Sequence, residues 1–555
     1  MKFYPYIAIF TLLTIFNSIA SAHSPAAIAS AHPLATEAGF EILAQGGNAF
    51  DAAIAVSAAL AVVEPAASGL GGGGFWLLHR EKDHFEVMID GRETAPQGAT
   101  RDMFIDMNGN VNESLSKNGG LAAAIPGLPA ALEHLALKYG QLPLAQSLQP
   151  AIRYARQGFQ IGKRYRKLLA FRAEVLKQNS AASHIFLSNQ QVPAEKSWLK
   201  QPDLARTLEK IAEQGKAGFY QGEIAQRLVK SVIQSGGIWT VQDLQRYQVI
   251  ERVPIQGEFH GIKITSAAPP SSGGIVLIEA LNILATYPLT KVDSITRKHL
   301  ITEALRRAYH DRSLYLGDSD FVNIPVSQLL NPHYAAGLRS SLRLDRALPS
   351  EWLSDDPNQS TDGIDTTHFS IIDAEGNRVA ATLSINYPFG AGIVAEGTGV
   401  VLNDQMDDFS VKPGEKNSYG LTGGTANAIA GGKRMLSSMT PTFLEDEQRI
   451  AVLGAPGGSR IISMILLAVL DFAEQHLPES WVKLPRFHHQ YLPDQIEYEP
   501  NTFTDAEIRG LQALGHHLTQ TSYTYGDMQA VYYHKKTQQL SAASDPRGEG
   551  SAVVK

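Results

Sequence analysis

The feature that most constrains the fold begins at Thr366, where alternating residues predict two paired strands. Thr366, His368 and Ser370 alternate with β-branched or aromatic neighbours, which is a period of two. A turn is predicted at 373–377, and a second strand over 378–385 runs back from it. The sequence therefore predicts a β-hairpin whose first strand begins with hydroxyl side chains and an imidazole.

A threonine pair at the start of a strand is not by itself a catalytic signal, because threonine favours strands. Polar side chains follow the hairpin closely in the sequence: Asn386, Gln405, Asp407 and Asp408. Two further motifs, one rich in serine and one in glycine, come at 436–439 and 455–460. The combination, rather than the hairpin alone, indicates a site built around Thr366.

Four motifs in this order resemble the γ-glutamyltransferase (glutathione hydrolase) family. They are Asp365–Ser370, Asn403–Phe409, Leu436–Met439 and Ala455–Arg460. The similarity extends from about His32 to Arg547, which is nearly the whole chain. The resemblance implies an α+β protein with the four-layer αββα sandwich of the N-terminal-nucleophile hydrolases, made of two fragments from one self-cleaved precursor.

Composition excludes several classes of binding partner and of functional site. The chain has 555 residues, of which 44% are hydrophobic, so it is long enough for a large buried core. The net charge of −7 gives no indication of a nucleic-acid or anionic-membrane partner. Cysteine is absent, which excludes disulfides, thiolate metal sites and cysteine nucleophiles.

Two histidine pairs are the only sequence feature that invites a metal site. Neighbouring residues on a helix or a strand diverge, so neither 488–489 nor 516–517 offers two ligands to one ion. The His-Glu-Xaa-Xaa-His motif is also missing. We expect a packing or surface role for these histidines, and we expect neither a metal nor a cofactor.

The N-terminus has the pattern of a signal peptide. Lys2 supplies a positive charge, 6–16 is apolar, and 20–22 reads Ala-Ser-Ala, which suits cleavage after Ala22. The apolar run is too short for an ordinary membrane span, although a short anchor is the alternative. We therefore expect export, to the periplasm in a Gram-negative source and by secretion otherwise, with no membrane span after residues 1–22 are removed.

Helices are predicted on both sides of the glycine-rich segment 69–75. Residues 33–64 read as two helices interrupted at Gly46, and mostly helical patterns also cover 126–240, including one over 144–157. The glycines at 69–75 lack the lysine of a phosphate loop, so we expect them to pack closely against another backbone.

Two later helices are predicted at 274–285 and 297–315. Residues 343–364 are polar and predict a flexible, exposed segment. This segment leads directly to Asp365.

A flexible segment that ends before a hydroxyl nucleophile is a suitable place for self-cleavage. We expect the Thr366 hydroxyl to attack the carbonyl of Asp365, which would give fragments 23–365 and 366–555 and a heterodimer of the two. The α-amine released on Thr366 has an ordinary pKa of about 7.7–8.0. It can therefore serve as the base for its own hydroxyl, without a His–Asp pair.

The resemblance also implies the roles of individual residues. It implies an oxyanion hole at Gly457 and Gly458, and support for the nucleophile from Ser384 and Thr367. It implies substrate-binding residues in two groups: Arg92, Ser437 and Ser438 for an α-carboxylate, and Asn386, Gln405 and Asp408 for an α-ammonium. Tyr419, in a segment that resembles a lid, is expected to be its gate.

The function implied is transfer of the γ-glutamyl group from glutathione and related compounds to water, an amino acid or a dipeptide. The first alternative is a related N-terminal-threonine acylase that acts on β-lactam side chains or poly-γ-glutamate. The second is a non-enzymatic exported binding protein, which would not need cleavage before Thr366. A serine hydrolase is disfavoured because no Gly-Xaa-Ser-Xaa-Gly motif occurs.

Overall fold

The computed structural model describes residues 25–353, 366–411 and 424–555. The signal peptide, Asp365 and Tyr419 lie outside these residues. In the described part, no helix is both long enough and apolar enough to cross a membrane.

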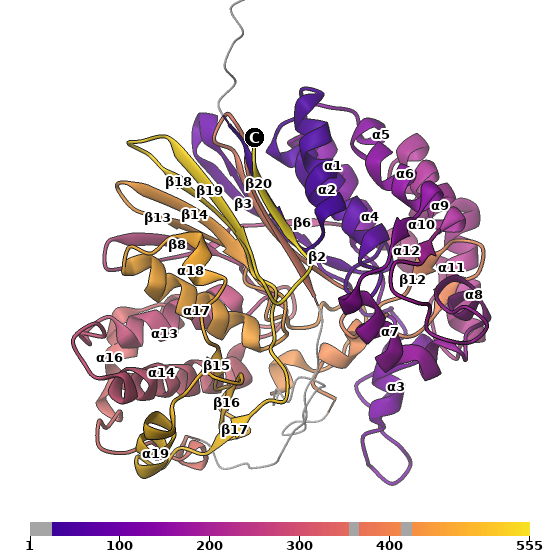
Figure 1. Cartoon of the computed structure of the whole chain (residues 1–555). Helices are drawn as coiled ribbons and strands as arrows, with labels where there is room; N and C mark the ends of the chain where they lie inside the picture. Colours follow the sequence, from indigo (N-terminus) through magenta and orange to yellow (C-terminus); the bar gives the residue numbers. More distant parts are fainter. Residues whose placement is uncertain (1–24, 354–365, 412–423) are drawn as a thin grey trace, which may run out of the picture.

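Two β-sheets pack face to face, and helices cover the outer face of each, so the predicted four-layer αββα arrangement is confirmed (Figure 1). In spatial order, the first sheet is β20 (Ser551–Val554), β1 (Ala27–Ser30), β9 (Thr367–Ile372), β10 (Arg378–Ser384), β2 (Gly73–Arg80), β3 (Phe85–Gly91) and β6 (Ile250–Arg252). The second sheet is β19 (Gln539–Ser544), β18 (Gln529–His534), β14 (Arg449–Gly454), β13 (Thr442–Glu445), β8 (Ile262–Ser266) and β7 (Ile255–Phe259).

The helical layer beside the first sheet comes from the first half of the chain (Figure 1). Its helices are α1 (Pro33–Ala44), α2 (Ala49–Val63), α4 (Leu128–Lys138), α5 (Leu144–Ser147), α6 (Gln149–Gln157), α7 (Lys163–Leu176), α8 (Ser180–Phe186), α9 (Pro202–Gln214), α10 (Ala217–Tyr220), α11 (Gly222–Gln234) and α12 (Val241–Arg246). The short α3 (Glu113–Lys117) lies at the lower end of this half.

The other helical layer lies beside the second sheet (Figure 1). It contains α13 (Gly273–Leu284), α14 (Ser294–Tyr315), α15 (Val326–Leu329), α16 (Pro332–Ser340), α17 (Arg460–Ala473), α18 (Pro478–Trp481) and α19 (Asp505–Ala513). Smaller strands pair outside the two sheets: β4 (Phe159–Gln160) with β5 (Trp198–Leu199), β11 (Val394–Ala395) with β12 (Val400–Val401), and β16 (Ile496–Tyr498) with β15 (Phe487–His488) and β17 (Leu518–Gln520).

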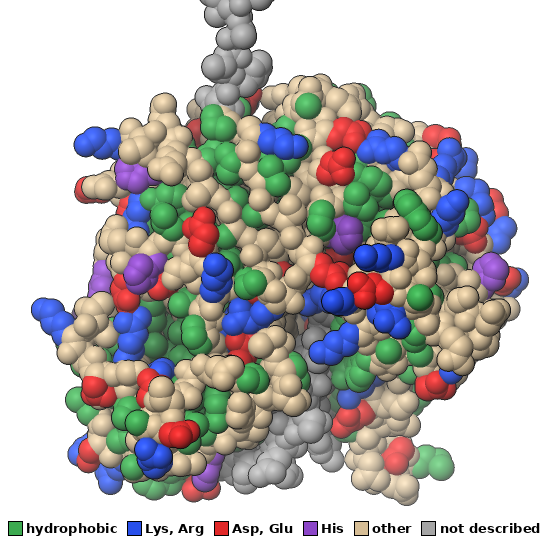
Figure 2. Space-filling view, in the orientation of Figure 1, with side chains coloured by type: hydrophobic (Ala, Val, Ile, Leu, Met, Phe, Trp, Pro, Cys, Tyr) green, Lys and Arg blue, Asp and Glu red, His purple; other side chains and the backbone are tan. Residues whose placement is uncertain are grey.

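The core is divided by the first sheet, and strand β2 shows how. Trp76 and Leu78 pack with the helices on one face, whereas Phe75 and Leu77 pack between the two sheets. A strand buried on both faces needs apolar residues in both alternating positions. On the exterior, acidic and basic side chains are interspersed over the face that Figure 2 draws.

The residues at the N-terminus of helix α2 show how the sequence determines where a helix begins. Asn48 caps its N-terminus by accepting from the amides of Phe50 and Asp51, and Asp51 in turn accepts from the amide of Asn48. Every residue of the helix is buried. The predicted core helix is therefore confirmed.

The glycine-rich segment packs against other backbone, as predicted. A side chain at Gly71 or Gly72 would overlap the carbonyl oxygens of Val401 and Ser384, respectively. This close approach places the start of β2 directly beside the end of β10, since Gly73 pairs with Ser384.

One prediction about local structure is wrong. The helix expected over 144–157 is divided at Leu148 into α5 and α6, because Pro150 begins a new helix. Part of the predicted flexible segment lies outside the described residues. In its described part, residues 343–346 and 351–352 are exposed, as predicted, whereas Ser350 is buried and its amide donates to Asp494 Oδ2 at 2.8 Å.

Candidate functional site

The site forms where several strands end or begin at the same edge of the sandwich. Thr366 directly precedes β9, and the antiparallel register of β9 with β10 places it opposite Ser384. Thr366 Oγ1 lies 3.5 Å from Ser384 Oγ. Ser384 Oγ also accepts from the amide of Asn386 at 2.8 Å, which fixes the hydroxyl beside Thr366.

One cavity brings together most of the residues predicted for the site. The predicted residues that line it are Arg92, Thr366, Ser384, Asn386, Gln405, Asp408, Ser437, Ser438 and Gly458. Gly457 is the neighbour of Gly458 in the chain. Thr367 is not among the lining residues, because its hydroxyl points away and donates to Glu64 Oε2 at 2.7 Å.

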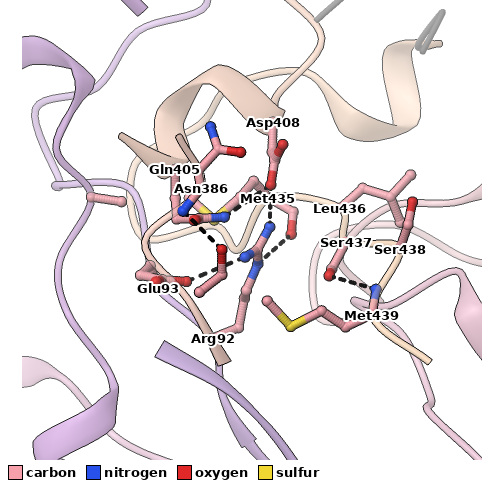
Figure 3. A network of polar contacts seen from close by, with 12 residues as sticks. Arg92, Glu93, Asn386, Gln405, Asp408, Met435, Leu436, Ser437, Ser438 and Met439 are labelled. Atoms are coloured by element: carbon pink, nitrogen blue, oxygen red, sulfur yellow. Dashed lines mark hydrogen bonds and ion pairs between the residues drawn. The ribbon is translucent and has the colours of Figure 1, made fainter. Parts of the chain in front are cut away.

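Arg92 and Asp408, which both line the cavity, form an ion pair (Figure 3). Arg92 Nη2 donates to Asp408 Oδ2 at 2.5 Å, and Gln405 Nε2 donates to the same oxygen at 2.9 Å. Arg92 also contacts Glu93 Oε2 at 3.4 Å. A cation and an anion therefore lie side by side in the lining of the cavity that Thr366 also lines.

The residues at 405–408 form a single 3₁₀ turn and not an extended strand. The turn separates the two adjacent aspartates: Asp408 points to Arg92, and Asp407 accepts from Ser116 Oγ at 2.5 Å. The choice of Asp408 as the site residue thus agrees with the geometry, and Asp407 has a structural partner.

Burial raises the pKa values of two acids: Asp408, which lines the cavity, and Glu93, which contacts Arg92 but does not line the cavity. It raises the pKa of Asp408 to about 6, although Arg92 acts in the opposite direction. It also raises the pKa of Glu93 to about 7. Glu93 Oε1 and Gln405 Oε1 are buried without a hydrogen-bond partner among the described residues. Of the two residues only Gln405 lines the cavity, so its oxygen is an acceptor available to a positively charged ligand group.

The glycines at 457 and 458 connect β14 to α17 and have the backbone geometry that glycine permits. Their φ angles are 136° and 57°, which disfavour other residues. Neither amide donates to any residue that the structure describes. Two backbone amides that donate to no described residue and lie just before a helix can stabilise a negative oxygen.

Five residues that line the cavity were not among the predicted site residues: Arg312, Leu436, Met439, Ser459 and Ile461. Arg312 comes from α14 and donates to Ser438 Oγ at 3.2 Å. Nothing in the sequence separates it from the other arginines of that helix. Glu93 does not line the cavity, but it contacts Arg92, which it directly follows in the sequence.

Clusters that could in principle hold a metal ion lie elsewhere in the described residues. The most buried contains His299, Glu303 and His516. His299 Nδ1 and His516 Nε2 share a hydrogen bond of 2.7 Å, and Glu303 is paired with Arg307. Internal partners thus account for this cluster, and none of its residues lines the cavity.

Comparison with known proteins identifies the family. A sequence model described as Gamma-glutamyltranspeptidase matches residues 35–555. The chain belongs to this family. Relatives named glutathione hydrolase proenzyme are 41% identical in Escherichia coli K12, over 94% of this chain and 90% of the relative, and 38% identical in Pseudomonas aeruginosa PAO1, over 98% and 99%.

Solved structures agree with the gamma-glutamyltranspeptidase assignment. Helicobacter pylori gamma-glutamyltranspeptidase is 42% identical, with a TM-score of 0.57 over 59% of this chain and 94% of that one. A cephalosporin acylase from Bacillus halodurans is 26% identical, with a TM-score of 0.84 over 100% and 98% of the two chains. The fold is therefore shared by enzymes whose names state different substrates.

Proposed function

We propose that this chain is a self-processing γ-glutamyltransferase and glutathione hydrolase in which Thr366 is the nucleophile. The observation that carries the proposal is the pairing of Arg92 with Asp408 beside Thr366. An α-amino acid head group carries one carboxylate and one ammonium, and a site with both charges is complementary to it.

Maturation uses the same hydroxyl as catalysis. In the precursor, Thr366 Oγ attacks the carbonyl carbon of Asp365 and the peptide nitrogen leaves, which gives an ester. Water hydrolyses the ester, so that Asp365 ends in a carboxylate and Thr366 gains a free α-amine. The products are fragments 23–365 and 366–555, which remain together as a heterodimer. Removal of residues 1–22 accompanies export, to the periplasm in a Gram-negative source.

In the mature enzyme, Thr366 Oγ attacks the γ-carbonyl carbon of the substrate. The α-amine of Thr366 accepts the hydroxyl proton and returns it to the leaving amine. The amides of Gly457 and Gly458 stabilise the oxyanion. The γ-glutamyl ester on Thr366 is then transferred to water, an amino acid or a dipeptide. Ser384 holds the nucleophile, and Thr367 supports it indirectly through its bond to Glu64.

Two groups of residues recognise the two charges of the substrate head group. Arg92, Ser437 and Ser438 bind the α-carboxylate, and Asn386, Gln405 and Asp408 bind the α-ammonium. The acceptor oxygen of Gln405, which has no partner among the described residues, supports this division. Tyr419 is proposed as the gate of a lid over this site.

The second candidate function is that of an acylase with a different substrate, because the fold also matches that of a cephalosporin acylase. The buried Arg92–Asp408 pair favours an amino acid over such a side chain, since an uncharged group would leave the buried charges without a ligand partner.

Intact masses of the purified protein test the proposal. We expect two associated fragments that begin at residues 23 and 366, and hydrolysis of γ-glutamyl-p-nitroanilide. Thr366→Ala is expected to remain a single chain with no activity, because it lacks the attacking hydroxyl. Ser370→Ala, two repeats of the strand pattern after Thr366, is the matched control and should still be cleaved. A wild-type chain that stays intact would contradict the proposal and favour a binding protein.

A further inference from the structure

Arg312 is a second buried guanidinium at the cavity, and its surroundings differ from those of Arg92. Its exposed fraction is 4%. Its Nε donates to Ser272 Oγ at 2.9 Å, and its Nη2 donates to Ser438 Oγ at 3.2 Å. Among the residues that the structure describes, no carboxylate lies within ion-pair distance of it.

The charges of the two arginines are balanced differently. Arg92 is paired with Asp408 and contacts Glu93, so protein carboxylates already offset its charge. Burial lowers the pKa of Arg312 to about 10, which leaves it protonated at neutral pH. A buried cation is costly unless an anion accompanies it. Asp408 also acts on Arg312 electrostatically, but no ion pair to a carboxylate holds Arg312 among the described residues. The charge of Arg312 is therefore less compensated than that of Arg92, and a ligand carboxylate can offset it.

The direction of the hydrogen bonds adds a second argument. A guanidinium can only donate, so Ser438 Oγ must accept from Arg312 and its own proton is directed elsewhere. Ser272 likewise accepts from Arg312, and its hydroxyl donates to the carbonyl of Ser437 at 2.8 Å. Arg312 thus holds the main chain at 437 and turns the Ser438 hydroxyl into a donor.

We propose that Arg312 is a positioning residue for recognition of the substrate α-carboxylate: it orients Ser438 as a hydrogen-bond donor and supplies the compensating positive charge. This inference rests on the proposed function. Arg312 lies in α14, more than a hundred residues before Ser438 in the chain, and outside the motifs that contain the other proposed binding residues.

The test compares two substrates that differ only at the α-carboxylate. One is γ-glutamyl-p-nitroanilide, and the other carries an α-carboxamide in place of the carboxylate. Arg312→Gln should raise KM for the first substrate about 10–100-fold, as expected for a lost charge-assisted contact, with kcat changed much less. The carboxamide should be affected little. The ratio of kcat/KM between the substrates should therefore fall at least about tenfold.

A second variant and a control separate this role from packing. Arg312→Lys keeps the charge but cannot reach both serines, so the substrate ratio should fall about three- to tenfold. Arg307→Lys, on the same helix and paired with Glu303, should leave the ratio unchanged. If Arg312→Gln does not fold, the lysine variant carries the test.

The result that overturns the inference is an unchanged substrate ratio in the folded Arg312 variants beside an active wild type. An equal loss of kcat/KM for both substrates would also overturn it, because it would indicate a structural role alone. A wild-type enzyme that cleaves neither substrate would refute the proposed function itself, and the inference with it. The two failures are therefore distinguishable.

Discussion

At the scale of single residues, the protonation of Asp408 controls the proposed ammonium site. Burial raises its pKa to about 6, so the carboxyl is neutral below that pH and ionised above it. A neutral carboxyl no longer balances the ammonium of the substrate. We expect kcat/KM for γ-glutamyl-p-nitroanilide to rise with pH through about 6, by up to about tenfold per pH unit on the acidic side. Initial rates at low substrate concentration give this profile.

Two asparagine variants show whether Asp408 is the titrating group. Asp408→Asn should have low activity without the rise near pH 6, because an amide does not titrate. Asp407→Asn changes the neighbour that bonds Ser116 and should keep the rise. A rise that persists unchanged in Asp408→Asn would assign the titration to another buried acid, such as Glu93, which contacts Arg92 and whose pKa burial raises to about 7.

The candidate site was predictable from the sequence wherever its residues lie in motifs. Arg92, Asp408 and Ser438 could be named because each stands in a segment that resembles the family's sequence. Arg312 could not, since its role depends on where α14 crosses the 437–438 segment. The sequence also did not show that the Thr367 hydroxyl points away from the cavity, because its partner Glu64 lies some three hundred residues away in the sequence.

At the scale of elements, the packing of β14 against β9 depends on the last residue of β14. Gly454 lies against the His368 ring, and a side chain there would overlap it. The ring cannot easily move, because Thr382 Oγ1 and Ser370 Oγ hold its two nitrogens at 2.8 and 3.1 Å. We expect Gly454→Ala to lower the free energy of unfolding by about 1–3 kcal/mol and to slow self-cleavage. Urea unfolding measures the first effect.

The matched control for this element is Gly337 in α16. A side chain there meets no atom within 4 Å, so Gly337→Ala should raise the stability by up to about 1 kcal/mol through helix propensity. Equal stability of Gly454→Ala and wild type would contradict the proposed fit between the sheets.

Elements were predictable to different degrees, for physical reasons. The β9–β10 hairpin and α2 follow from local periodicity and length, and both were predicted. The division at Leu148 was missed, because the apolar pattern continues through it while Pro150 interrupts the hydrogen bonding. The order of strands in the sheets depends on pairings between distant segments, such as β1 with β20, and periodicity carries no information about these.

At the scale of the whole molecule, both sheets are built jointly by the two proposed fragments. Strand β1 of fragment 23–365 lies between β20 and β9 of fragment 366–555. The fragments meet again where β10 pairs with β2 and where β13 pairs with β8. Cleavage before Thr366 therefore cuts the chain without separating any paired strands among the described residues.

This interleaving predicts that the fragments stay associated after cleavage. We expect processed protein to elute as one species on size exclusion at submicromolar concentration, and both fragments to unfold in one transition in urea. Fragment 366–555 expressed alone should not fold, because β9 and β20 would lack β1, which pairs with both. Uncleaved Thr366→Ala is the control, and its unfolding midpoint does not depend on protein concentration. Separation of the fragments under native conditions would contradict the prediction, since it would require both sheets to be broken without denaturant.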